Sequence, residues 1–168
     1  MSQLIIVVIS IALVAVAALS AAYYGGGAFM NGQAKAHANE VANAFDQENA
    51  ALQLYNADNG IIYSPPTYGD SLSFLVPVYL SNLPKPFQGI SFYNAGGNIT
   101  SILVARLGTN EAVCKQIEAL RTGTVPVSLR PYSSSFSNVI VGKIGCFYDD
   151  LGAWGSDHVA YYTPYGWP

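Results

Sequence analysis

The first 24 residues form an almost uninterrupted apolar run. Between Leu4 and Ala22 only Ser10 and Ser20 are polar, and the first charged side chain of the chain is that of Lys35. A helix rises about 1.5 Å per residue, so this run is long enough to cross the roughly 30 Å hydrocarbon core of a bilayer. We therefore expect residues 1–24 to form a hydrophobic helix that is buried either in a membrane or among copies of itself.

A second helical pattern covers residues 33–57. Apolar residues recur there at intervals of three, four and seven positions, which places them on one side of an α-helix. This stripe consists of Ala34, Ala38, Val41, Phe45, Leu52 and Tyr55. It predicts an amphipathic helix that packs one face on a globular head and ends at Asn59-Gly60, because glycine commonly terminates helices.

Three consecutive glycines lie between the two patterns: Gly25, Gly26 and Gly27. Each glycine in a helix costs about 1 kcal/mol relative to alanine, so we expect a break or kink here. A plain loop between an anchor and a domain is the alternative. The expected organisation is a hydrophobic helix over 1–24, the glycine break and amphipathic half over 25–60, and a globular head over 61–168.

Short helix and strand patterns alternate through the head. A short helix is expected at 71–84, capped by Asp70 or Ser71 and kinked or ended by Pro77, and an amphipathic helix at 110–121 with Val113, Ile117 and Leu120 on one side. Strands are expected at 91–93, 99–107, 125–131, 137–149 and 158–163. Glycines in the connector 94–98 favour an antiparallel hairpin between the first two strands. This order of elements predicts an α+β fold.

Composition narrows the classes of function. Only 10% of the residues are charged, the net charge is −3, and the seven Lys and Arg residues are scattered, which disfavours nucleic-acid binding. The chain has two cysteines, Cys114 and Cys146. An even count behind an export-type N-terminus predicts one disulfide, with two buried free thiols as the alternative.

Candidate catalytic chemistry is sparse. The pair Asp157-His158 has no nucleophile motif and no metal-ligand spacing beside it, so we expect no enzyme activity, no catalytic residue and no cofactor. Asp149 and Asp150 could join Asp157 around a calcium ion, but nothing in their spacing requires one, and we expect no metal site. His37 lies beside the charged side of the second helical pattern and is expected to be solvated.

The chain resembles the type IV pilin family, most closely its type IVb branch and the related pseudopilins. The resemblance rests on the uncharged N-terminal helix and its Ala-rich continuation KAHANEVANAFDQENAALQLYNADNG. It also rests on the phrase VPVYLSNLPKPFQG and on the cysteines within NEAVCKQIEALR and KIGCFYD. It implies a pilin fold, in which a long broken N-terminal helix packs on a small antiparallel sheet and a disulfide closes the C-terminal region.

The function that the resemblance implies is that of a structural subunit of a type IV pilus. Identical subunits would form a helical filament on the bacterial surface after storage in the inner membrane. A prepilin peptidase would remove a short basic leader ahead of Met1, and the pilus assembly machinery would build the filament, used for adhesion or motility. The residues expected to pack in the filament core are Met1, Leu4, Ile5, Val8, Ala12, Ala15, Ala18 and Ala22.

One position departs from the family pattern. Type IV pilins usually carry a glutamate at the fifth mature position, where this chain has Ile5. The buried amine of Met1 then needs another partner, because an unpaired buried charge is costly. This departure favours the alternative of a minor pilin or a type II secretion pseudopilin that primes or caps a filament. A periplasmic binding domain tethered by one membrane helix is the second alternative.

Overall fold

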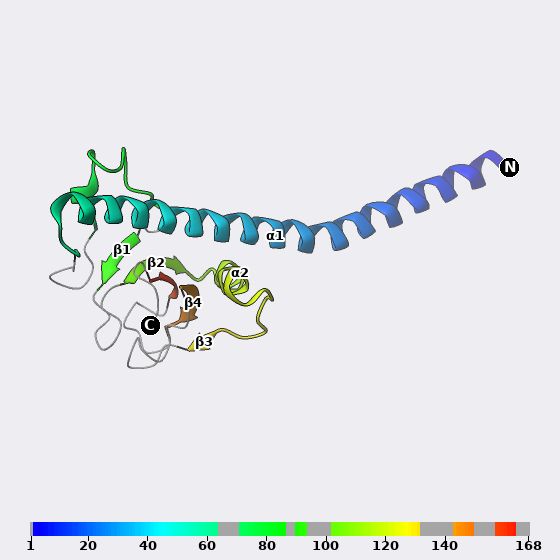
Figure 1. Cartoon of the computed structure of the whole chain (residues 1–168). Coiled ribbons are helices and arrows are strands. Elements are labelled where there is room, and N and C mark those ends of the chain that lie inside the picture. Colours follow the sequence, from blue (N-terminus) through cyan, green and yellow to red (C-terminus); the bar gives the residue numbers. More distant parts are fainter. Residues whose placement is uncertain are drawn as a thin grey trace. The chain divides into compact units, whose positions relative to one another are not determined.

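The computed structural model describes residues 2–63, 71–86, 90–93, 102–131, 143–149 and 157–163 (Figure 1). The N-terminal helix α1 spans Ser2–Asn59 and is followed by an α+β head, as predicted. The helical elements of the head are the short 3₁₀ helix η1 (Ser73–Leu75) and the helix α2 (Glu111–Thr122). Its strands are β1 (Ile90–Tyr93), β2 (Ile102–Gly108), β3 (Arg130–Pro131), β4 (Ile144–Tyr148) and β5 (His158–Tyr162).

The helix α1 is not broken at the glycines. Its helical hydrogen bonding runs through Gly25, Gly26 and Gly27, and none of the three has a positive φ. The predicted break is therefore wrong for this structure. Each glycine weakens the helix, but extending a helix that already exists on both sides is far less costly than starting a new one. The predicted end of the helix is confirmed, since α1 stops at Asn59 and Gly60 has φ +64°.

The chain divides into two compact units, residues 1–34 and 35–168. The second unit contains the amphipathic half of α1 together with the whole head. The predicted boundaries after residues 24 and 60 thus follow changes in sequence pattern, whereas the compact units divide within α1 itself. The hydrophobic segment belongs to the first unit.

The five strands form one sheet with the order β1-β2-β5-β4-β3. The pairs β1–β2, β2–β5 and β5–β4 are antiparallel, and β3 pairs with β4 in parallel, so the expectation of a wholly antiparallel sheet needs this one correction. The strand expected over 125–131 is reduced to two residues at the sheet edge. Its prolines explain this, because proline has no N–H to donate to a ladder. The connector 94–98 lies outside the described residues.

The helix predicted over 71–84 is much shorter than expected, and it ends before Pro77, as predicted. Only the three residues of η1 are helical there, and the following Val76 is extended with φ −97° and ψ 138°. The ring of a proline disfavours the helical conformation of the residue before it, which is Val76 here. Pro77 itself has no N–H to donate to a helical hydrogen bond. The expected cap Asp70 lies outside the described residues.

The prediction for α2 is confirmed, with one exception that matters below. The helix ends at Gly123 with φ 77°, and Val113 and Ile117 are buried. However, Leu120 is 44% exposed although the pattern places it on the apolar side.

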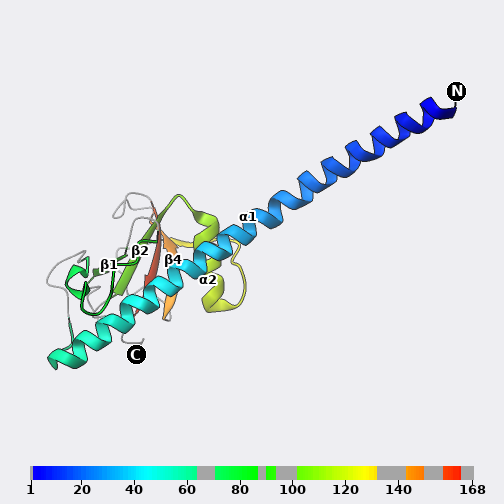
Figure 2. The ribbon, with the colours of Figure 1, turned by 90° about the horizontal axis from the view of Figure 1, so that it is seen from above.

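The predicted stripe of α1 packs on the sheet (Figure 2). Val41, Phe45 and Leu52 are completely buried, and Tyr55 is half-buried. The central strand β5 supplies the main partner, Tyr162, whose ring stacks on Phe45 at 5.7 Å. The hydroxyl of Tyr162 donates to Asp46 Oδ1 at 3.0 Å, so the same residue anchors both the apolar face and its polar border.

An aromatic cluster holds the end of α1 to the segment that follows it. The ring of Tyr55 lies 4.7 Å from Phe74 and 5.7 Å from Tyr79, and Tyr63 links this group to Phe92 of β1 at 5.8 Å. Such aromatic pairs contribute about 0.5–1.5 kcal/mol each beyond their buried area. Contacts between aromatic side chains therefore fix the segment around η1 on the end of α1.

A carboxyl group interrupts the buried face of α1. Glu48 is only 1% exposed, and the Oε2 atom of its side chain has no hydrogen-bond partner among the described residues. Burial raises the pKa of Glu48 to about 8, because the charged form would lose its hydration. Glu48 is therefore protonated at neutral pH.

Replacing Glu48 should change how stability depends on pH. The unfolded chain releases this proton near pH 4.5 and the folded chain only near pH 8, so stability falls as the pH rises through that window. Glu48→Gln cannot ionise and should lose this part of the pH dependence. Between about pH 5 and pH 8 the free energy of unfolding should fall by about 3–4 kcal/mol more in the wild type than in the variant.

Denaturant unfolding in detergent at both pH values measures this difference. The control is Glu111→Gln, because Glu111 is exposed and the nearby Lys115 lowers its pKa, out of the tested window. Parallel pH profiles for the wild type and Glu48→Gln would contradict the prediction.

Candidate functional site

The first half of α1 presents a large apolar surface. Every large aliphatic side chain from Ile5 to Leu19 is between 53% and 72% exposed. Small side chains alternate with them, and Ala12, Ala15 and Ala18 are exposed as well. Small residues allow a neighbouring helix to approach closely. This surface is apolar all round, unlike that of a helix with one face in water.

The two serines in this run do not interrupt its apolar character. The hydroxyl of Ser10 donates to the carbonyl of Ile6 at 2.8 Å, and that of Ser20 donates to the carbonyl of Val16 at 2.9 Å. A hydroxyl that bonds within its own helix needs no water and no outside partner. From the sequence alone, both serines count as interruptions of the apolar run. A serine within a helix can nevertheless donate to the carbonyl four residues before it, as these two do.

An apolar surface of this size needs a cover. Leaving these aliphatic side chains in water costs on the order of 10 kcal/mol, at about 25 cal/mol per Å² of apolar area. The segment is long and apolar enough to cross a membrane. A bilayer and a bundle of similar helices are both suitable covers, because neither offers water to the side chains.

The predicted core-packing residues fall mostly on this surface. They are Ile5, Val8, Ala12, Ala15, Ala18 and Ala22, all of which are exposed. The side chains of Met1 and Leu4, and with them the amine of Met1, lie outside the described residues.

The predicted disulfide between Cys114 and Cys146 is confirmed. It joins α2 to β4 with a Cα–Cα distance of 5.4 Å, and both residues are completely buried. The two cysteines are 32 positions apart, and closing a loop of this length removes about 3–4 kcal/mol of chain entropy from the unfolded state. The disulfide therefore fixes α2 on the sheet.

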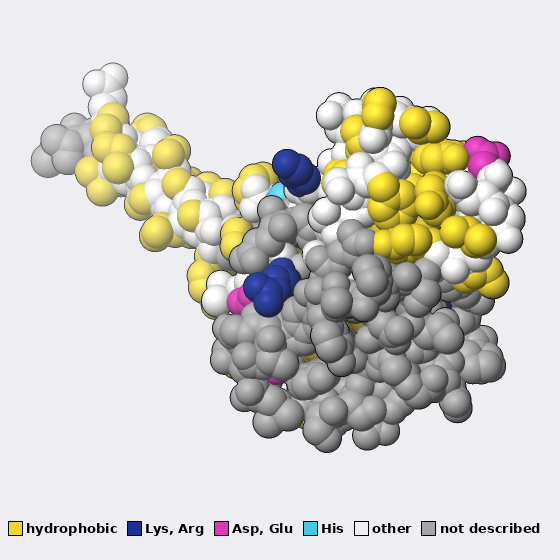
Figure 3. Space-filling model, turned by 90° about the vertical axis from the view of Figure 1, so that its left-hand side faces the viewer, with side chains coloured by type: hydrophobic (Ala, Val, Ile, Leu, Met, Phe, Trp, Pro, Cys, Tyr) yellow, Lys and Arg dark blue, Asp and Glu magenta, His cyan; other side chains and the backbone are white. Residues whose placement is uncertain are grey.

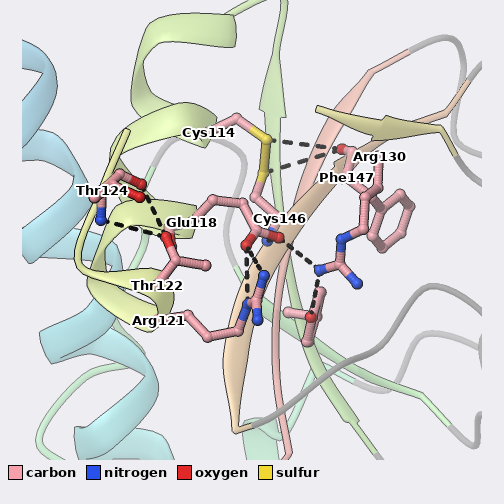
Figure 4. A network of polar contacts seen from close by, with 9 residues as sticks. Cys114, Glu118, Arg121, Thr122, Thr124, Arg130, Cys146 and Phe147 are labelled. Atoms are coloured by element: carbon pink, nitrogen blue, oxygen red, sulfur yellow. Dashed lines mark hydrogen bonds and ion pairs between the residues drawn. A yellow bond between two sulfur atoms is a disulfide. The ribbon is translucent and has the colours of Figure 1, made fainter. Parts of the chain in front are cut away.

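A buried carboxylate reinforces the same junction (Figure 4). Glu118 lies one helical turn after Cys114, and its side chain is only 5% exposed. Arg121 donates to its Oε2 at 2.9 Å, Arg130 of β3 donates to its Oε1 at 2.6 Å, and the backbone N–H of Cys146 donates to Oε1 at 3.1 Å. One carboxylate thus joins α2, β3 and β4.

The network extends to the central strand. Arg130 also donates to the hydroxyl of Tyr161, which is completely buried in β5, at 3.0 Å. Gly145 of β4 makes room for this ring, because a Cβ there would lie only 2.6 Å from Cζ of Tyr161. Sequence reasoning missed this network, whose one local signal was an acidic residue on the buried side of α2.

The remaining candidate polar residues have local partners. His158 Nδ1 lies 3.0 Å from the carbonyl oxygen of Gly108, and His37 pairs with Glu40 at 3.2 Å on an exposed surface. Among the described residues no three His, Cys, Asp or Glu side chains are grouped to hold a metal ion. Asp150 lies outside these residues, and the expectation of no enzyme activity stays a prediction.

Comparison with known proteins gives no match to a family model, to a curated protein or to a solved structure. Inference about function therefore depends on the surface and the contacts described above.

Neutralising Glu118 should destabilise the head strongly. In Glu118→Gln the guanidinium groups of Arg121 and Arg130 would remain half-buried without a carboxylate. We expect a loss of about 2–4 kcal/mol in the free energy of unfolding. Thermal or denaturant unfolding measures it, and the control Glu111→Gln removes an exposed pair on the same helix with little effect. Equal stability of the two variants would show that the network is dispensable.

Proposed function

We propose that this protein is a structural subunit of a type IV pilus-like filament on the bacterial surface. The observation that carries the proposal is the fully exposed apolar surface of α1 from Ile5 to Leu19, which needs a cover. In the proposed filament, the same segments of neighbouring copies provide that cover. Adhesion, motility, DNA uptake and conjugation are all uses that such a filament can have.

The continuity of α1 supports a filament more than a simple tether. The apolar segment and the stripe that packs on the sheet belong to one helix without a break. A force applied to the head thus passes along helical hydrogen bonds into the segment that neighbours hold. A long N-terminal apolar helix, a small sheet and a disulfide are also together compatible with a pilin-like fold.

Two successive environments suit the apolar segment. Before assembly, residues 1–24 would lie in the inner membrane with the head outside the cytoplasm. Assembly would move the segment from lipid into a core of similar helices, so the side chains would stay away from water throughout. Because the two environments are similarly apolar, the transfer is nearly balanced, and an assembly machinery can drive it.

Ile5 favours a second candidate function. A subunit without the family's glutamate at this position lacks the acid that would pair with a neighbour's terminal amine. Such a subunit suits a minor pilin or a pseudopilin, present in few copies at one end of a filament. The two candidates differ in where the chain occurs along the filament.

Electron microscopy with immunolabelling tests the proposal. The chain is expressed in a bacterial host with a type IV assembly system, and sheared surface material is examined with an antibody to the head. Label along the whole length of fibres is expected for the main subunit, and label at one end for a minor one. A chain that stays monomeric in the membrane fraction would overturn the filament proposal.

A charge on the apolar surface should abolish assembly. In Val8→Asp every copy would bring an unpaired carboxylate into the core, at about 2.5–3.5 kcal/mol per copy. We expect at least about a tenfold loss of sheared fibres relative to the wild type, because neither lipid nor a core of apolar helices solvates the carboxylate. The matched control is Asn43→Asp, an exposed position on the head-bound half of α1, which should assemble normally. Equal fibre yields would contradict burial of Val8.

A further inference from the structure

An exposed apolar patch lies where α1 ends. It comprises four exposed side chains, which we call the knob: Leu54, Ile61, Ile62 and Val78. Their exposed fractions run from 51% to 76%. Figure 3 shows hydrophobic side chains gathered on this face of the head, with an acidic side chain at their border. Four such side chains close together on a small head are a candidate contact surface.

The acidic border of the knob is held in place. Asp58, in the last turn of α1, accepts a hydrogen bond from the hydroxyl of Tyr79 at 3.0 Å. Tyr79 is the neighbour of Val78 in the chain, and its ring packs edge-to-face against Tyr55, so the carboxylate is fixed beside the knob. Among the described residues no lysine, arginine or histidine pairs with Asp58.

A concave apolar site lies near the start of the head-bound half of α1. This site, which we call the socket, is a pocket of about 250 Å³ between α1 and the end of α2. Leu120, Val125 and Ala38 line it, and Lys35 stands among the lining residues. It is smaller than the roughly 300–1,000 Å³ of small-molecule sites, so it suits the side chains of a protein partner.

The socket also exposes apolar side chains and one lysine that has no ion-pair partner among the described residues. Leu120 is 44% exposed and Val125 is 53% exposed, although both are large aliphatic residues. Lys35 is exposed and has no ion-pair partner among the described residues. The apolar side of α2 thus extends beyond the core of the head into the socket.

The knob and the socket face opposite ends of one compact unit. Lys35 and Asp58 both lie on α1, and at about 1.5 Å per residue their 23 positions of separation correspond to roughly 35 Å. One end of the unit thus presents apolar side chains beside an acid, and the other presents an apolar hollow beside a base. The two surfaces are both apolar and carry opposite charges at their borders.

We infer that the knob of one copy binds the socket of the next copy, with Asp58 of the first opposite Lys35 of the second. A contact between two different surfaces of identical subunits does not close on itself unless a rotation makes a ring, so it propagates as an open filament. This inference rests on the proposed filament. It adds a contact between the globular heads of successive copies to the packing of the apolar helices.

A charge swap tests the pairing. Asp58→Lys alone and Lys35→Asp alone place like charges opposite each other, and each should lower the fibre yield roughly 3- to 10-fold. The double variant Asp58→Lys with Lys35→Asp restores opposite charges and should recover the yield to within about twofold. Tyr79→Phe is the control for the lost hydrogen bond, because it removes the hydroxyl but keeps Asp58 charged.

Cross-linking tests the contact without relying on charge. Ile62→Cys combined with Val125→Cys should give, on oxidation of fibres, a ladder of covalent multimers on a denaturing gel. The matched control replaces Val125→Cys by Asn43→Cys, which is exposed on the same unit, 11 positions before Leu54 along α1 and not among the residues that line the socket. The native cysteines are already joined to each other and should not contribute.

The outcomes separate this inference from the filament proposal. Rescue by the double variant together with a ladder from the first cysteine pair alone supports it. Fibres that form normally but give no ladder and no rescue overturn the knob–socket contact and leave the filament proposal standing. If the unmodified chain forms no fibres, both are overturned.

Discussion

Apolar side chains occur along almost the whole of α1, and each stretch of them has to be kept from water. From Ala38 to Tyr55 the chain provides its own cover, since the sheet buries the stripe and Tyr162 anchors it. From Ile5 to Leu19 the aliphatic side chains are exposed in the single chain. One helix therefore combines a segment that completes a domain with a segment that is complete only beside lipid or other helices. The proposed function follows from this difference.

Three kinds of interaction hold the head together and fix it to the second half of α1: a side-chain contact from β5, a disulfide and a buried carboxylate. The strand β5 is buried throughout and contacts α1 through Tyr162, while β4 on its other side carries Cys146. The disulfide and the carboxylate of Glu118 both fasten α2 to this part of the sheet. The charge-assisted hydrogen bonds are stronger than neutral ones, and the disulfide is covalent, so it persists even when the head is briefly unfolded. Such a construction suits a surface structure under mechanical load.

Periodicity predicted the elements whose packing depends on local pattern. The stripe from Val41 to Tyr55, the helix α2 and the strands β1, β2, β4 and β5 all carry such a pattern. The break at Gly25–Gly27 was wrong because counting residue preferences ignores the cooperativity of a helix already formed on both sides. The network of Glu118 could not be predicted, because its partners Arg130 and Cys146 are brought to it only by the sheet order. The same holds for the socket, which exists because α2 and α1 meet.

In the proposed filament, the apolar half of α1 is covered by the same segment of other copies. A helical reconstruction by cryo-electron microscopy of fibres formed by this chain tests it most directly. We expect the helices of residues 5–23 to lie together along the fibre axis, with Val8 and Ala12 in contact with neighbouring helices and the heads outside. Fibres in which these helices lie at the surface, or in which only the heads touch, would contradict it.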